Sequence, residues 1–333
     1  MHRRQVTGLV MCGLGAALIV LAPLLHWWVG PSLIKSPIGG NSVSDASGDN
    51  ITYLDFADPN KREQTGTVRS RDVYHSIAAD STRSVAVYEL DSEIYYTDEP
   101  DLSLDISASQ ERFAIDRKTG LAVADPKGKE RIDTDTNNQW SKHSGLILKF
   151  PFGTEKKDYP FWDSQIRSSE YPMQFRGQET LEGLTVYRFE QNIPDTDLSA
   201  QTANLHYASL RTAWVEPTTG VIVKGQQTVK ITLGAPSDPN KATVLDGTLT
   251  FTDQNIKAAA QKAKDGRAKV AMINVYLPLI CLVLGLIALV AGLLLTRGGE
   301  RAGEPAARDR RGRRHGPPSA EDEPTATYPV QGR

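Results

Sequence analysis

The central region of this sequence contains no cysteine. The chain of 333 residues has only Cys12 and Cys281, and both lie within long apolar runs near its two ends. Disulfide bonds are therefore excluded from the region between the runs, although an exported compartment would permit them. The roughly 240 residues between the runs are enough to bury a conventional hydrophobic core, so we expect packing alone to stabilise them.

The sequence also lacks a dominant charge and the common catalytic motifs. Its 38 Lys and Arg residues nearly balance 40 Asp and Glu residues, and no basic stripe typical of nucleic-acid-binding proteins is present. The six histidines show no metal-ligand spacing, and a P-loop and a dinucleotide fingerprint are missing. Ser32-x-x-Lys35 and Lys118-Thr-Gly120 match two parts of the penicillin-binding signature, but the S-D-N triplet is absent. We therefore predict no enzyme activity, no cofactor, no metal site and no nucleic-acid partner.

Two long apolar runs give the strongest signal. They cover residues 6–29 and 273–295, and the second contains no charged side chain. A bilayer core of ~30 Å requires about 20 apolar residues in a helix, so each run is predicted to span the membrane. The first run ends in Trp27 and Trp28, as is typical of the membrane interface, and lacks the small-residue cleavage site of a signal peptide. We therefore expect the first helix to remain uncleaved.

Arginines precede the first run and follow the second. Such residues favour the cytoplasmic side, which predicts a two-pass plasma-membrane protein with both termini in the cytoplasm and the main domain outside it. The topology-setting residues are Arg3, Arg4, Arg297, Arg301, Arg308, Arg310 and Arg311. Small residues also recur at four-residue spacing, a pattern that is common in membrane helices and allows close helix contact. They are Gly13 and Ala17, and Ala288 and Gly292.

The region between the runs has the period-two pattern of β-strands. Within 221–233 apolar side chains alternate with polar ones, as expected for a half-buried strand. The predicted segments are a cytoplasmic N-terminus (1–5), a transmembrane helix (6–29), a loosely ordered approach with one short strand at 51–56 (30–65), a first β unit (66–165), a second β unit (166–252), a helical lead-in (253–272), a second transmembrane helix (273–295) and a disordered, Arg-rich cytoplasmic tail (296–333).

The two β units share a repeated pattern. VAVYELDSEI at 85–94 resembles LTVYRFEQNI at 184–193, and AIDRKTGLAV at 114–123 resembles WVEPTTGVIV at 214–223. The matching offsets favour an internal duplication over two unrelated hairpins. We therefore predict a mainly β exported region made of two similar antiparallel units. The residues expected to form the repeated hairpin turns are Asp116, Thr119 and Gly120 in the first copy and Glu216, Thr219 and Gly220 in the second.

An aromatic segment at 145–163 lies between the two units. One interpretation is a contact surface for a lipid, a glycan or a protein partner. The other is a strand and corner that fill the core between the units, which the usual burial of large aromatic side chains favours. The candidate contact residues are Phe150, Phe152, Tyr159, Phe161 and Trp162.

The same segment, GLILKFPFGTEKKDYPFWD, carries a family resemblance. With AIDRKTGLAV before it and ETLEGLTVYRFEQ after it, it resembles the actinobacterial porin PorA family, formerly an envelope family of unknown function. The resemblance extends over nearly the whole chain, including both apolar runs. It implies a place in the actinobacterial cell envelope, with channel formation in the outer, mycolate-type layer for at least some members, and it implies no catalytic residues.

Two functional hypotheses follow. From the residues, we expect an anchored, extracytoplasmic β module that binds an envelope lipid, a glycan or a protein partner. The resemblance implies a channel-forming, porin-type protein instead. Because the polar connections between strands are longer than a membrane barrel allows, such a channel would have to arise from oligomerised helices. The predicted partners are therefore the lipid bilayer, an envelope ligand and further copies of the chain.

Overall fold

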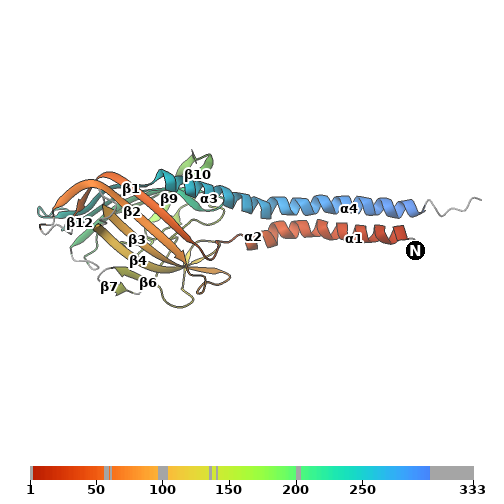
Figure 1. The fold of residues 1–333 in the computed structure, drawn as a ribbon, viewed down its shortest axis with the longest axis horizontal. Coiled ribbons are helices and arrows are strands. Elements are labelled where there is room, and N and C mark those ends of the chain that lie inside the picture. Colours follow the sequence, from red (N-terminus) through yellow and green to blue (C-terminus); the bar gives the residue numbers. More distant parts are fainter. Residues whose placement is uncertain are drawn as a thin grey trace, which may run out of the picture. The chain divides into compact units, whose positions relative to one another are not determined.

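The fold is known from a computed structural model (Figure 1). It divides into two compact units. The smaller consists of described residues 3–16 and 286–300, and the larger lies within 17–285. The residues that the structure describes are 3–55, 60, 62–96, 104–134, 137–139, 142–199 and 204–300.

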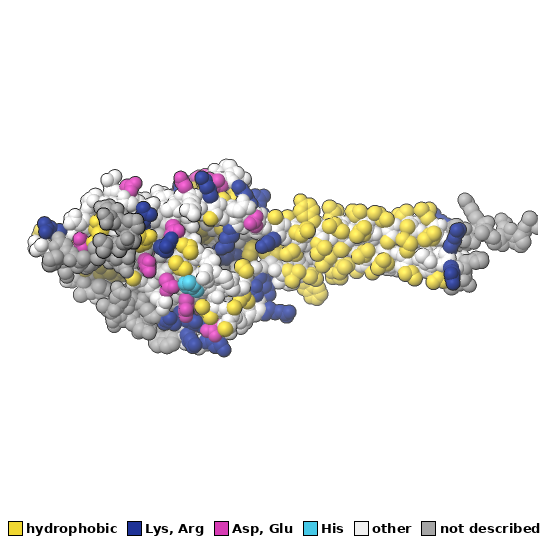
Figure 2. All heavy atoms as spheres, in the orientation of Figure 1, with side chains coloured by type: hydrophobic (Ala, Val, Ile, Leu, Met, Phe, Trp, Pro, Cys, Tyr) yellow, Lys and Arg dark blue, Asp and Glu magenta, His cyan; other side chains and the backbone are white. Residues whose placement is uncertain are grey.

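Long apolar helices form both ends of the described chain, as predicted. Both are long and apolar enough to cross a membrane, and only 17% and 11% of their most apolar stretches are buried within the protein. Hydrophobic side chains cover their surface (Figure 2). The elements are α1 (Arg3–Leu24), a π-helical turn η1 (Leu25–Val29) and α2 (Gly30–Leu33), then α3 (Asp253–Ala271), a π-helical turn η2 (Met272–Tyr276) and α4 (Leu277–Glu300).

Within the smaller unit, α1 and α4 touch at small residues. A Cβ atom added to Gly292 would lie 2.6 Å from Cys12 Sγ and 2.7 Å from the Gly8 carbonyl oxygen. Only glycine therefore lets the two backbones approach this closely. Gly292 belongs to the predicted small-residue pattern, whereas a Cβ added to Gly13 would meet nothing within 4 Å.

The larger unit is built on one antiparallel sheet. Its strand order is β7-β6-β4-β3-β2-β1-β13-β12-β11-β10-β9-β8, and β5 pairs separately with β4. The strands are β1 (Asn41–Leu54), β2 (Glu63–Ser76), β3 (Val85–Tyr96), β4 (Leu104–Asp116), β5 (Ala122–Val123), β6 (Arg131–Thr134), β7 (Asn137–Gln139), β8 (Tyr159–Pro160), β9 (Pro172–Leu181), β10 (Leu184–Asp197), β11 (Leu205–Glu216), β12 (Val221–Leu233) and β13 (Ala242–Phe251).

Strand β1 differs from the expectation for 30–65. Instead of a loose approach with a short strand, residues 41–54 form a long strand that pairs with β2 on one side and β13 on the other. Its Gly, Ser, Asn and Asp content has low β propensity, so pairing on both sides overrides the local preference. Gly48 is required there, because an added Cβ would lie 2.1 Å from the Thr248 carbonyl oxygen. Strand β1 thus joins both predicted β units into one continuous sheet.

The sheet curls until distant strands share a core. One buried cluster combines Ile51 of β1 and Val68 of β2 with Ile106 of β4 and Ile193 of β10. Six strands separate β4 from β10 in the sheet order. A flat sheet could not bring them together, because neighbouring strands lie about 4.8 Å apart. The curl gives the sheet a concave side.

Helix α3 closes over part of this sheet. It begins at an N-cap, where the Thr252 side chain accepts a hydrogen bond from the Asn255 N–H at 3.2 Å. Ala260 and Ala263 on one face pack against a buried cluster that includes Val223 of β12. The small alanine side chains let the helix lie close to the strands. The predicted helical lead-in at 253–272 is therefore present as α3.

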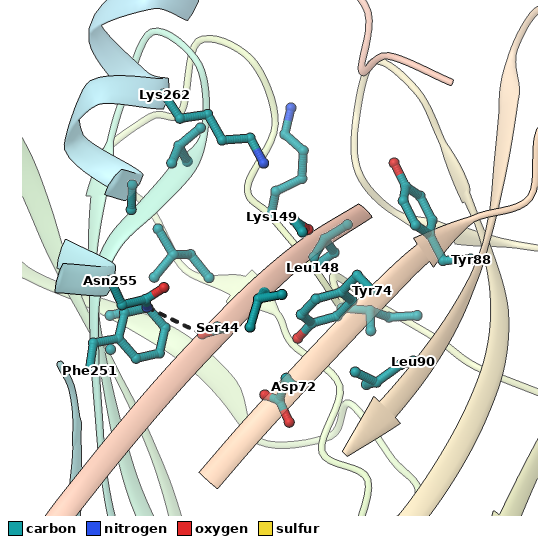
Figure 3. Close-up of a pocket in the computed structure, with 18 of the residues that line it drawn as sticks. Ser44, Asp72, Tyr74, Tyr88, Leu90, Leu148, Lys149, Phe251, Asn255 and Lys262 are labelled. Carbon is teal, nitrogen blue, oxygen red and sulfur yellow. Dashed lines mark hydrogen bonds between the residues drawn. The ribbon is translucent and has the colours of Figure 1, made fainter. Parts of the chain in front are cut away.

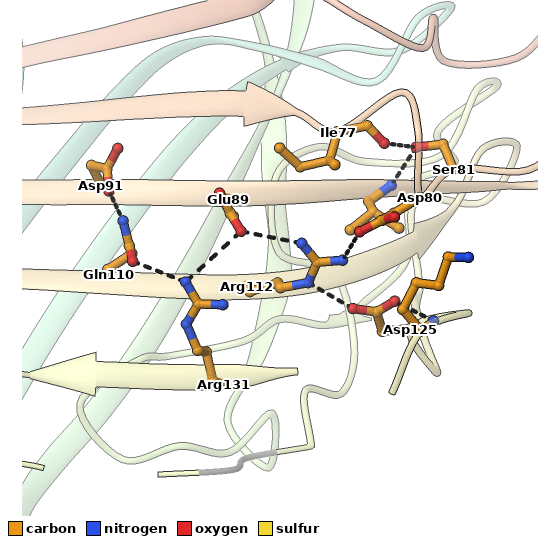
Figure 4. A network of polar contacts seen from close by, with 11 residues as sticks. Ile77, Asp80, Ser81, Glu89, Asp91, Gln110, Arg112, Asp125 and Arg131 are labelled. Atoms are coloured by element: carbon orange, nitrogen blue, oxygen red, sulfur yellow. Dashed lines mark hydrogen bonds and ion pairs between the residues drawn. The ribbon is translucent and has the colours of Figure 1, made fainter. Parts of the chain in front are cut away.

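A buried arginine fastens surrounding segments to β4 (Figure 4). Arg112 is 3% exposed, and its guanidinium forms ion pairs with Asp80 at 2.6 Å, Glu89 at 3.1 Å and Asp125 at 2.8 Å. Burial opposes ionisation of Asp125, but the hydrogen bonds from Arg112 and from the Lys127 N–H outweigh it and lower the pKa of that carboxyl group. The network ties the segment after β2 and the turn after β5 to the sheet.

Candidate functional site

The curled sheet and α3 surround a large cavity. Its volume is about 1220 Å³, above the range of roughly 300–1,000 Å³ for small-molecule sites. Strands β1 to β4 and β11 to β13 contribute lining residues, together with α3 and the aromatic segment 145–163. Leu33 of α2 and Lys35 after it, together with Val270 of α3 and Ile273 of η2, also line it. The cavity therefore reaches the points where the chain enters and leaves its apolar helices.

The aromatic segment 145–163 is held by both halves of the sheet. Leu146 and Phe150 belong to a buried cluster with β9, β10 and β11, whereas Ile147 and Leu148 pack against the cluster on β3 and β4. The Phe150 N–H also donates a hydrogen bond to the Gly220 carbonyl oxygen at 2.9 Å. Opposite faces of one short stretch thus contact opposite parts of the curled sheet, which fixes the position of the residues between them.

The five predicted aromatic contact residues divide between the core and the cavity. Phe150, Tyr159 and Phe161 lie in the buried cluster beside β10 and β11. Phe152, Phe161 and Trp162 line the cavity, although Phe161 and Trp162 are only 5% and 3% exposed. Phe152 is half-buried and presents more of its ring. Contact with a ligand stays a prediction for all five residues.

The two predicted hairpin turns have the same hydrogen-bond pattern. The Asp116 carboxylate accepts from the Thr119 N–H at 2.8 Å and hydroxyl at 3.0 Å, and the Glu216 carboxylate accepts from the Thr219 N–H at 2.9 Å and hydroxyl at 2.7 Å. The following glycines have φ of +75° and +73°. Both turns lie against segment 145–163, where a Cβ added to either glycine would come within 2.9 Å or 2.0 Å of a carbonyl oxygen.

Two lysines point into the cavity without an anionic neighbour. Lys149 extends from segment 145–163 and Lys262 from α3, and Figure 3 shows their amino groups directed towards the same region. Among the described residues neither amino group forms an ion pair or a hydrogen bond, although Lys149 Nζ lies 3.4 Å from the centre of the Phe152 ring. The sequence analysis missed both lysines, because nothing local distinguishes them from the other lysines of the chain.

Desolvation shifts the protonation of this lysine pair. Lys149 is half-buried and Lys262 is exposed, so the surrounding protein disfavours the charged form of Lys149 more strongly than that of Lys262. Burial accordingly lowers the pKa of Lys262 and lowers the pKa of Lys149 to about 7, to which the positive charge of Lys262 also contributes. Lys149 is therefore only partly protonated at neutral pH, and neither amino group has an ion-pair partner among the described residues.

The acidic groups elsewhere in the cavity are satisfied. The Asp163 carboxylate accepts from Arg211 at 3.1 Å and from the Tyr207 hydroxyl at 2.9 Å. Asp72 accepts a hydrogen bond from the Ser92 hydroxyl at 2.7 Å, and its burial raises its pKa, which favours the neutral form. Neither lysine of the pair therefore forms an ion pair with a carboxylate among the described lining residues.

The predicted topology-setting arginines lie at the outer ends of the apolar helices where they are described. Arg3 and Arg4 begin α1, and Arg297 lies near the end of α4. The remaining four lie outside the described residues: Arg301, Arg308, Arg310 and Arg311. Within the described ranges, no three His, Cys, Asp or Glu side chains are grouped so that they could hold a metal ion.

Comparison with known proteins identifies the family. The family model described as Porin PorA matches residues 7–294, which include most of both apolar helices and the whole sheet. The chain belongs to the porin PorA family. Membership implies a location in the cell envelope and association with a bilayer.

Two relatives are themselves named Porin PorA. The protein from Corynebacterium amycolatum is 25% identical over 299 residues, covering 67% of this chain and 77% of the relative. The protein from Corynebacterium resistens is 27% identical over 121 residues, covering 34% of this chain and 29% of the relative. The first of these similarities extends over most of both chains, and the second over about a third of this one.

Proposed function

We propose that this protein forms channels in the cell envelope by assembly of its apolar helices. The family match, which includes most of both helices, carries this proposal. Within the smaller unit, α1 and α4 of one chain touch at Gly8 and Gly292, so a solute cannot pass between them at that level. A conducting path therefore requires helices from several copies, and the channel is a homo-oligomer.

Single-channel recording of the purified full-length protein in a planar bilayer tests this function. The unmodified protein is expected to give discrete conductance steps. Gly292→Val should reduce their frequency by separating α1 from α4, whereas Gly13→Val, which meets no neighbour, should leave them unchanged. A silent bilayer from correctly folded protein would show that this member does not form channels.

A second function is favoured by the cavity. The larger unit is proposed to bind an envelope lipid, a glycan or a protein partner, because the cavity combines apolar side chains with charged groups and reaches the base of both apolar helices. Mass spectrometry of molecules that co-purify with the full chain tests it. Phe152→Ala should reduce ligand recovery, whereas Phe175→Ala, which packs outside the cavity, should not. Equal recovery of the co-purifying ligand from both variants would show that Phe152 does not contact it.

The chain is further proposed to span the plasma membrane twice with both termini in the cytoplasm. Arg3 and Arg4 at the start of α1, and Arg297 near the end of α4, support this orientation. In a cysteine-free background, a single cysteine introduced into an exposed strand residue should react with an impermeant maleimide in intact cells. One introduced beside Arg4 should react only after permeabilisation. The reverse pattern would invert the topology.

An internal duplication is proposed as the origin of the sheet. Hairpins β3–β4 and β10–β11 are each followed by a turn with the same side-chain hydrogen bonds, and both turns support segment 145–163. Sequence profiles built separately from the two halves of family members should match each other at offsets near those seen here. Profiles that fail to match would favour convergence on one turn type.

A further inference from the structure

The two lysines of the cavity, Lys149 and Lys262, have no counter-ion among the described residues. Lys149 and Lys262 extend from different elements towards one region, so their charges repel each other across it. Two like charges brought together and partly desolvated are unfavourable unless an anion lies between them. Lys149 is also fixed in place, because the flanking Leu148 and Phe150 pack against different parts of the sheet.

The surroundings of the pair increase this positive character. The charged lining residues on α3, on the stretch after α2 and on segment 145–163 include two acidic ones. Asp265 accepts a hydrogen bond from Gln261 at 2.9 Å, and Asp163 is paired with Arg211 at 3.1 Å. These charged residues are Lys35, Lys149, Lys262, Lys269, Asp163 and Asp265.

The rest of the cavity suits an apolar chain. Leu148, Tyr74 and Leu90 lie beyond the lysine amino groups in Figure 3 and line the same space. Towards α2 and η2 the lining includes Leu33 and Ile273, where the chain passes into its apolar helices. One connected space therefore offers cations at one place and apolar surface beside it.

We propose that this cavity binds an anionic amphiphile whose acid headgroup lies between Lys149 and Lys262 and whose apolar chain follows the apolar lining. The proposal rests on the second function above and names its ligand class. A carboxylate or a phosphate would each supply the missing charge. A free inorganic anion would supply the charge but leave the apolar surface uncovered. Contact between an apolar chain and the lining therefore distinguishes an amphiphile from a free anion.

Photo-crosslinking tests the proposal on the full-length protein in phosphatidylcholine nanodiscs. The probe is a sixteen-carbon fatty acid that carries a diazirine, and the matched control is the alcohol of the same chain. The acid should label peptides of segment 145–163 and α3, with an apparent affinity about tenfold or more above that of the alcohol. Lys149→Gln and Lys262→Gln should each remove about tenfold of that affinity, whereas Lys264→Gln, on the same helix but outside the cavity, should not.

The possible outcomes distinguish a wrong ligand class from a wrong proposal that the cavity binds a ligand. Equal labelling by acid and alcohol, unchanged by either lysine variant, would overturn the headgroup assignment while ligand binding stands. No labelling of the cavity by either probe would overturn the amphiphile, whereas the co-purification experiment decides separately whether the cavity binds a glycan or a protein partner. Competition by inorganic phosphate as strong as that by unlabelled fatty acid would show a free-anion site and overturn the amphiphile. Lys149→Arg, which keeps the charge, should retain binding in protein whose fold is checked by circular dichroism.

Discussion

Replacing Gly220 by alanine should detach segment 145–163 from the turn that supports it. Gly220 has φ of +73°, and a Cβ at this position would lie 2.0 Å from the Phe150 carbonyl oxygen. Contacts this short do not occur, so the segment must move. Two matched glycines separate the contributions: Gly183 has φ of +72° with no atom within 4 Å, and Gly120 has φ of +75° with a carbonyl oxygen 2.9 Å away.

The expected magnitudes follow from these distances. A left-handed backbone costs a non-glycine residue about 1–2 kcal/mol, which is the whole effect expected at Gly183. At Gly220 the movement also breaks backbone hydrogen bonds from the segment to residues 217–220, at 2.9, 3.2 and 2.7 Å. Each contributes about 0.5–1.5 kcal/mol, so Gly220→Ala should cost about 3–5 kcal/mol. Gly120→Ala should fall between the two.

Urea unfolding of the full-length protein in detergent, followed by tryptophan fluorescence, measures these differences. The urea concentration at the unfolding midpoint should be highest for Gly183→Ala, lower for Gly120→Ala and lowest for Gly220→Ala. Because the segment carries Lys149, Gly220→Ala should also reduce labelling by the fatty-acid probe in protein that remains folded. A Gly220→Ala midpoint equal to that of Gly183→Ala would show that the segment does not rest on this turn and would refute the reasoning.

Three further predictions concern other parts of the chain. Arg112→Met leaves three carboxylates without their cation and should destabilise the protein by about 3–5 kcal/mol at pH 7, measured by urea unfolding. This loss should persist down to about pH 4 and shrink as pH falls further, because the low pKa of Asp125 stabilises the unmodified protein only while that carboxyl is ionised. A loss that grew at low pH would contradict the network. Gly292→Val should lower the thermal midpoint in detergent relative to Gly13→Val, and equal midpoints would contradict the close helix contact. Fatty-acid labelling should weaken as pH rises above about 7, since Lys149 then loses its proton, and Lys149→Gln should flatten this dependence; an unchanged profile in that variant would assign the titration to another group.

The sequence predicted the elements with strong local signals. The apolar helices, the period-two strands and the two Thr-Gly turns depend on hydrophobic pattern or turn chemistry within a few residues, and all are present. Strand β1 was missed because its stability comes from β2 and β13, which are distant in the chain, rather than from its own composition. The tail beyond residue 300 lies outside the described residues, so its predicted disorder stays a prediction.

The candidate site was only partly predictable for a related reason. Segment 145–163 stands out by its aromatic content, and the aromatic residues mark where it enters the core. The chemically informative residue is Lys149 between them, whose environment depends on Lys262, more than a hundred residues later. Hydrophobic periodicity identifies surfaces that pack, but it cannot indicate which charged residue meets another across a curled sheet. The cavity itself is a property of the curl, and the curl arises from long-range strand pairing.

A cavity that belongs to the pore and a cavity that binds an amphiphile predict different effects of the same lysine variant. One variant can therefore distinguish the two roles. If solutes pass through the cavity on their way to the helices, Lys149 and Lys262 lie on the path and attract anions, so Lys149→Gln should shift channel selectivity towards cations. If the cavity holds an amphiphile, its chain occupies that space, so Lys149→Gln should lose probe labelling and leave conductance unchanged. The lining of the cavity extends to Leu33 of α2 and Ile273 of η2. Recording and labelling on the same preparation therefore decide whether the cavity belongs to the pore or to a binding site beside it.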